Sequence, residues 1–234
     1  MGAIIKKEFK MYFSSPIGYA IIGVLLIFSC SYYLAPFQGG LADMSYVFSG
    51  IVTIVFFVVP VITMRTFSEE KNKRTDQLLL TSPVSIGGIV LGKFFAAILF
   101  FAVYVGIMVL YNFAFLFFGA MPHMLTFFGN VLGILLLAGS LIAIGIFISS
   151  LTESQIVAAV ASFGVSFLLL QLDTIAAIFN NTVVTSICDW ISFSGRYATF
   201  TEGYFDLSNI IFFLTVIAVF LFLTMRVIDR KRWA

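Results

Sequence analysis

The seven residues from Gly87 to Lys93 have the spacing of a phosphate-binding loop. Their sequence, Gly-Gly-Ile-Val-Leu-Gly-Lys, fits the pattern G-x-x-x-x-G-K, in which backbone amides and the lysine hold nucleotide phosphates. Phe94 follows where such a loop needs a serine or threonine for Mg²⁺, and the run opens an apolar helix. We therefore interpret these residues as the start of a membrane-spanning helix, and we expect no ATP hydrolysis by this chain and no cofactor bound to it.

The other nucleophiles and potential metal ligands are scattered along the sequence. The single histidine, His123, falls in a short expected loop, and Ser194 has no histidine partnered with it. Cys30 and Cys188 fit no metal-binding or redox spacing. Hydrolysis inside a membrane needs a nucleophile with a base, or paired acids at depth. The sequence thus predicts neither catalytic residues nor a metal site.

A densely charged stretch, residues 65–83, has the pattern of a short helix with one apolar end. Thr66 and Glu69 have the spacing of a helix-capping box. Glu69 with Lys73, and Glu70 with Arg74, have the i,i+4 spacing of ion pairs on a helix. Leu78 and Leu79 make the end of the stretch apolar before Pro83 stops the helix. The pattern alone is compatible with a solvated linker and with a helix on the membrane surface that binds a soluble partner.

Composition places the elements that carry these residues in a membrane. The chain is 61% hydrophobic and 10% charged, whereas a soluble domain has about 25% charged residues. The basic residues form no patch that would suggest nucleic acid as a partner. Six apolar stretches are long enough to cross a bilayer: 17–37, 46–64, 86–118, 127–149, 155–172 and 210–227. We predict an all-α polytopic membrane protein with six transmembrane helices in a single domain, residues 1–234.

The distribution of lysine and arginine predicts the orientation of these spans. With six spans, twelve of the thirteen basic residues fall on one face, and Arg196 alone falls on the other. Basic residues concentrate on the cytoplasmic side of membrane proteins. We therefore expect a multi-pass protein of the cell membrane with both termini in the cytoplasm.

Two further segments are expected to be membrane-associated without crossing the bilayer. In residues 1–15, Ile5, Phe9 and Phe13 can share a helical face opposite Lys6 and Lys10, which predicts a helix lying on membrane lipid at the inner leaflet. Residues 173–206 are too apolar for a solvated loop and too short for two crossings. We interpret this second segment as a re-entrant outer segment between the fifth and sixth spans, packed against protein.

A few residues within the spans are polar or very small. Asn112 and Ser140 are candidates for a substrate pathway, or for hydrogen bonds between packed helices. Gly129 and Gly133 allow close approach of another helix, either within the subunit or between subunits.

The charged stretch resembles the signature of ABC-2 type transporter permeases, E-E-[basic]-x-x-x-T-x-[E/D/Q]-L-L-x-[T/S]-x-P-[V/I]-[S/T]. The matching residues are Glu69, Glu70, Lys71, Thr75, Gln77, Leu78, Leu79, Thr81, Pro83, Val84 and Ser85. The family often has glycine where Arg74 stands, a difference that concerns the local turn. The run from Leu91 to Phe94 and the overall plan of the chain are also similar to the family, with most likeness to its gliding-motility-type subgroup.

This resemblance implies that residues 65–83 are a coupling helix that docks into a separate ATP-binding cassette subunit. Leu78 and Leu79 would anchor the helix, and Glu69, Glu70, Lys71 and Arg74 would set the charge of the docking surface. ATP and Mg²⁺ would bind that partner, and a second permease copy or related permease would complete the transporter. The alternative is a non-transporting membrane scaffold that couples a partner ATPase to mechanical or regulatory work in the cell envelope.

Overall fold

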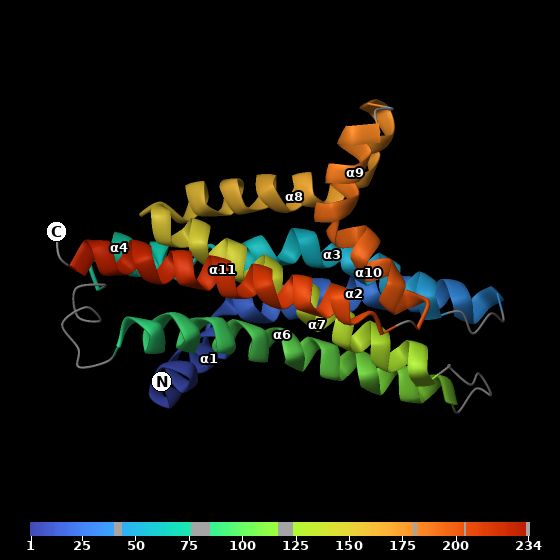
Figure 1. The fold of residues 1–234 in the computed structure, drawn as a ribbon. Helices are drawn as coiled ribbons and strands as arrows, with labels where there is room; N and C mark the ends of the chain where they lie inside the picture. Colours follow the sequence, from blue (N-terminus) through green and yellow to red (C-terminus); the bar gives the residue numbers. More distant parts are fainter. Residues whose placement is uncertain (40–43, 76–84, 117–123, 180–181, 204, 233–234) are drawn as a thin grey trace.

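The computed structural model describes residues 1–234 except 40–43, 76–84, 117–123, 180–181, 204 and 233–234. The described residues form helices and no strand. The helices are α1 (Gly2–Ser14), α2 (Pro16–Gly39), α3 (Met44–Thr63), α4 (Ser68–Asn72), α6 (Ile86–Leu116), α7 (Met124–Leu151), α8 (Gln155–Phe179), α9 (Thr182–Ile191), α10 (Phe193–Thr201) and α11 (Leu207–Arg232). Most long helices run side by side, with α1, α4 and the last turns of α11 at one end and α9 and α10 toward the other (Figure 1).

Within the described residues, six helices are long and apolar enough to cross a membrane, which agrees with the six predicted spans: α2, α3, α6, α7, α8 and α11. Their bounds lie within three residues of the apolar stretches, except at the ends of the last two. Helix α11 continues to Arg232, five residues past the predicted end. The larger difference is at the end of the fifth stretch. There α8 continues past Asp173 to Phe179, because the residues between are compatible with a helix. The outer connection is therefore shorter than the predicted 173–206.

Helices α3 and α7 form the centre of the bundle. In each of them, 67% of the residues in the candidate span are buried, against 17% in α8 and in α11. The core contains branched and aromatic side chains from facing helices, such as Val55 of α3, Phe101 of α6 and Ile142 of α7. Exposed apolar side chains along α8 and α11, such as Phe163 and Phe222, are suited to contact with lipid, which is as apolar as a protein core.

Helix α1 lies against the first half of α6. The approach is close at Gly92, where an added Cβ atom would lie 2.9 Å from Cγ2 of Ile4. Further along, the ring of Tyr12 stacks on that of Phe100 with 4.8 Å between centroids. The small residues of the G-x-x-x-x-G-K run thus serve helix packing at the position where the sequence resembles a phosphate-binding loop.

The connection between α8 and α11 contains two short helices. The backbone N–H of Gly195 donates to Oγ of Ser192 at 2.8 Å, which caps the start of α10. Helix α10 packs on α7, and its Phe200 side chain is fully buried. In Figure 1, α9 projects away from the bundle and α10 returns the chain to it.

Candidate functional site

The predicted coupling helix is only partly helical where the structure describes it. A turn follows α3, and α4 then spans five residues, Ser68–Asn72. The predicted capping box is wrong, because the residue before α4 is Phe67 and no side chain caps the helix from that position. The chain then turns at Arg74, whose φ of 55° is left-handed. Leu78, Leu79 and Pro83 lie outside the described residues.

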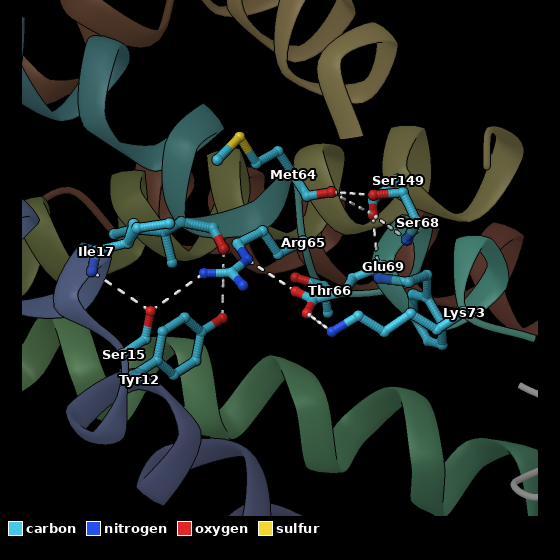
Figure 2. Close-up of polar contacts among 12 residues, drawn as sticks. Tyr12, Ser15, Ile17, Met64, Arg65, Thr66, Ser68, Glu69, Lys73 and Ser149 are labelled. Carbon is cyan, nitrogen blue, oxygen red and sulfur yellow. Dashed lines mark hydrogen bonds and ion pairs between the residues drawn. The ribbon is translucent and has the colours of Figure 1, made fainter. Parts of the chain in front are cut away.

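Ser149, at the C-terminal end of α7, takes the place of the missing cap. Its Oγ accepts hydrogen bonds from the backbone N–H groups of Phe67 and Ser68, each at 3.1 Å. The same hydroxyl donates to the carbonyl oxygen of Met64 at 3.2 Å. One buried side chain therefore satisfies three backbone groups of the turn between α3 and α4 (Figure 2).

Lys71 ties α4 to the same end of α7. The residue is buried, and its Nζ donates to the backbone carbonyl of Ser150. Cations near the C-terminal carbonyl groups of a helix are stabilised by its dipole. Lys71 is therefore engaged within the chain.

A buried ion cluster connects α4 with α1 and α6. Nζ of Lys93 lies 3.1 Å from Oε1 of Glu8 and 2.9 Å from Oε2 of Glu70. The same ammonium group donates to the carbonyl oxygen of Thr66 at 2.8 Å and lies 5.0 Å from the ring centroid of Phe67. Lys93 is fully buried, so the two carboxylates and the carbonyl replace the water that its charge would otherwise need.

At the rim of this cluster the charges are more accessible. Glu69 accepts a hydrogen bond from Nε of Arg65 at 2.8 Å and forms an ion pair with Lys73 at 2.7 Å (Figure 2). The pair of Glu69 with Lys73 is one of the two predicted i,i+4 pairs. The predicted pair of Glu70 with Arg74 is not formed, because Glu70 points to Lys93 and lies 3.7 Å from Nζ of Lys7. Arg74 is exposed beside the turn.

Tyr12 closes the cluster on the side of α1. Its hydroxyl donates to the carbonyl oxygen of Ile62 at 3.4 Å, which joins α1 to the end of α3 (Figure 2). Burial raises the pKa of the Tyr12 phenol well above its ordinary value, and the nearby charge of Glu8 raises that pKa further. The phenol therefore remains a neutral hydrogen-bond donor.

The other predicted site residues lie away from this end of the bundle, except for Thr75. The backbone N–H of Thr75, directly after Arg74, donates to the carbonyl oxygen of Glu70 at 2.9 Å. Oγ of Ser140 in α7 donates to the carbonyl oxygen of Phe213 in α11 at 3.2 Å, as a helix-packing hydrogen bond does. Asn112 belongs to α6, and its side chain lies outside the described part of the chain.

Gly129 and Gly133 of α7 face α10 of the same subunit. An added Cβ at Gly129 would lie 3.1 Å from the carbonyl oxygen of Phe200, and one at Gly133 would lie 2.9 Å from Cγ of that ring. The helix approach that the sequence left open is thus made within the subunit. Nearby, Tyr197 of α10 donates to Oδ1 of Asn130 in α7 at 2.8 Å, and this contact strengthens the same packing.

Sequence reasoning missed three residues that hold the site together: Glu8, Lys93 and Ser149. Glu8 is the one acid of an otherwise basic N-terminal segment, and Lys93 interrupts an apolar run. Both are signals of a buried charge that has found a partner. Ser149 carried no such signal, because a serine near the end of an apolar helix is common.

The described side chains offer no group of three or more His, Cys, Asp or Glu residues that could hold a metal ion. The six apolar helices and the charge network at one end define the class: this is an α-helical, multi-pass membrane protein. A sequence model of the family described as ABC-2 family transporter protein matches residues 2–233. The chain belongs to that family, whose members are membrane transport components that are not themselves catalytic and that normally work with an ABC ATPase subunit. A search of curated proteins gives no match.

Proposed function

We propose that the chain is the permease subunit of an ATP-binding cassette transporter, and that the end of the bundle at α4 receives the force of a separate ATPase. The observation that carries this proposal is the attachment of α4 to three other helices. Ser149 and Ser150 bind it to α7, and Lys93 binds it to α6 and α1. A push on α4 therefore reaches rigid spans directly instead of being absorbed by a flexible loop.

The docking surface of this proposal differs from the one that the resemblance implied. Glu69, Glu70 and Lys71 have partners within the chain, so their role is to hold α4 in place. Arg74 is exposed, and Lys73 remains 64% exposed although it pairs with Glu69, so these two side chains are accessible to a partner. Leu78 and Leu79, which follow them in the sequence, keep their predicted role as apolar anchors.

The proposal also assigns the surroundings of the bundle. Both termini and α4 lie on the cytoplasmic side of the cell membrane, and α1 lies on the inner leaflet. Helices α9 and α10 form a re-entrant outer segment. ATP and Mg²⁺ bind the partner ATPase, and a second permease copy or a related permease completes the pathway. The exposed basic residues Lys6, Lys7 and Lys10 on α1 support this orientation.

Co-purification from native membranes in mild detergent, followed by mass spectrometry, tests the proposal. We expect a soluble subunit with a phosphate-binding loop, whose ATP turnover changes on reconstitution with the permease. The double variant Lys73→Glu/Arg74→Glu should lose this subunit while remaining folded. The matched control Lys6→Glu/Lys10→Glu changes charge equally on α1 and should retain it.

Two results would contradict parts of this proposal. Absence of any ATPase across several detergents, with the permease intact, would overturn the transporter function. ATP turnover that depends on an envelope protein, and that moves no cargo in vesicles, would favour the alternative of a mechanical or regulatory scaffold.

A further inference from the structure

Two adjoining hollows lie where α1 meets the ends of α2 and α3. The first, which we name the slot, has a cavity volume of about 30 Å³ and apolar walls from the two spans, along which it is open. These walls are Ile17, Gly18 and Ile21 of α2, and Val61 and Ile62 of α3. Ile17 and Val61 are more than one-third exposed, so the slot opens toward the hydrocarbon side of these spans.

The second hollow, which we name the vestibule, has a cavity volume of about 380 Å³ and is lined mainly by charged residues. Lys7, Arg65 and Lys73 supply its cations, and Glu69 and Glu70 supply its carboxylates. Met11, Arg65 and Glu69 line both hollows. The slot and the vestibule are therefore two ends of one amphipathic surface.

Positive charge dominates the accessible part of the vestibule. The side chains of Lys7 and Lys73 are 61% and 64% exposed, whereas those of Glu69 and Glu70 are each 12% exposed. Glu70 is also neutralised from behind by the buried ammonium group of Lys93 at 2.9 Å. An anion that enters the vestibule thus meets lysine ammonium groups before it meets a carboxylate.

Arg65 lies at the junction of the two hollows, and not all of its hydrogen-bond donors are used. Its Nε donates to Glu69 and its Nη1 donates to Oγ of Ser15 at 3.2 Å. Its Nη2 has no hydrogen-bond partner among the residues that the structure describes. Guanidinium groups bind phosphate oxygens well because their donors form a planar fork.

From these observations we infer that the slot and vestibule bind an anionic phospholipid of the adjacent leaflet. Its phosphate lies among Lys7, Arg65 and Lys73, and one acyl chain follows the apolar walls of α2 and α3. Basic pockets next to membrane spans are suited to such headgroups. An acidic segment of a protein partner would occupy the vestibule but would leave the slot, which faces lipid, without an occupant.

The bound lipid would add a connection of α1 to α3 and α4, beside the Tyr12–Ile62 hydrogen bond and the Lys7–Glu70 ion pair. This inference goes beyond the proposed function and does not depend on it, because it concerns the permease alone. It is tested on the purified full chain in the absence of any ATPase, so its failure would leave the transporter proposal standing.

Native mass spectrometry and thermal unfolding of the delipidated protein test this site with phosphatidylglycerol and phosphatidylcholine. We expect retention of phosphatidylglycerol by the wild type and stabilisation on its addition, with little effect of phosphatidylcholine. Lys7→Gln/Lys73→Gln should weaken phosphatidylglycerol binding on the order of tenfold. The control Lys6→Gln/Lys10→Gln removes the same charge from exposed positions outside both hollows and should bind as the wild type does.

A third variant and a soluble probe separate the two hollows. Val61→Trp fills the slot and should weaken lipid binding while the vestibule charges remain, and glycerol 3-phosphate should stabilise the protein far less than the lipid does. An equal loss of phosphatidylglycerol binding in the two double-lysine variants would overturn the site, because it would indicate attraction by diffuse surface charge. Equal binding of the two lipids, or equal stabilisation by glycerol 3-phosphate, would also overturn it. Unchanged phosphatidylglycerol binding in the Lys7→Gln/Lys73→Gln variant would overturn the site as well.

Discussion

The ammonium group of Lys93 in α6 lies 3.1 Å from the carboxylate of Glu8 in α1, although the two residues are 85 positions apart in the sequence. Both side chains are almost completely buried, and Glu70 of α4 completes the cluster from the other side. One buried ammonium group thus joins α1, α4 and α6. The energetic value of this arrangement depends on all its members being present.

Lys93→Met should destabilise the protein by about 3–5 kcal/mol, because it leaves two carboxylates buried without a counter-ion. Unfolding in detergent, followed by denaturant titration, measures the loss. The triple variant Lys93→Met/Glu8→Gln/Glu70→Gln should recover most of the stability, since it removes the unpaired charges. The exposed control Lys10→Met should change little. A loss below about 1 kcal/mol for Lys93→Met would show that the cluster is solvated.

Ser149→Ala should loosen the turn between α3 and α4. The substitution removes the acceptor of two backbone N–H groups, at a cost of about 1–3 kcal/mol. Hydrogen exchange of the Phe67 and Ser68 amides should become faster. The neighbour Ser150 is a matched control, because its Oγ donates to Phe147 of its own helix at 2.7 Å and Ser150→Ala keeps the carbonyl that Lys71 uses. Unchanged exchange in Ser149→Ala would mean that water replaces the hydroxyl.

Arg74→Gly should stabilise the turn after α4 by up to about 1 kcal/mol. A left-handed conformation costs a residue with a Cβ about 1–2 kcal/mol, and the greater flexibility of unfolded glycine offsets part of the gain. Arg74→Ala is the control, because it removes the charge and keeps the strained φ of 55°. The two variants are compared by thermal unfolding in detergent. Equal stability of both would show that the positive φ carries no strain.

Gly133→Ala should destabilise the contact between α7 and α10 by about 1–3 kcal/mol. The new methyl group would lie 2.9 Å from the ring of Phe200, which is fully buried. Gly106→Ala is the control, since an added Cβ there meets nothing within 4 Å. That control should be neutral or slightly more stable, because alanine favours the helix. Denaturant unfolding measures both, and equal effects would contradict tight packing at Gly133.

The spans were predictable from the sequence, whereas the site was predictable only in outline. Apolar runs of the right length are sufficient to define helices in a membrane, where every backbone group must be bonded within the element. The pair of Glu69 with Lys73 was predictable for a similar reason, because it depends on helix spacing alone.

The contacts that hold α4 were not predictable, because each depends on how distant helices pack. Glu70 has Arg74 four residues away, but it pairs with Lys93, whose buried charge needs a carboxylate more than an exposed arginine does. Ser149 caps α4 only because α7 ends beside the turn. A sequence pattern indicates local spacing and burial, but it does not indicate which helix ends lie next to each other in the bundle.

The distance along the chain between Glu8 and Lys93 has a consequence for biosynthesis. Glu8 leaves the ribosome early, but its partner follows only after α2, α3 and α4 have been made. Until then the carboxylate of Glu8 lacks the ammonium group that is buried with it. The first helix to be synthesised therefore reaches its final contacts only after α6, the third span, has been made.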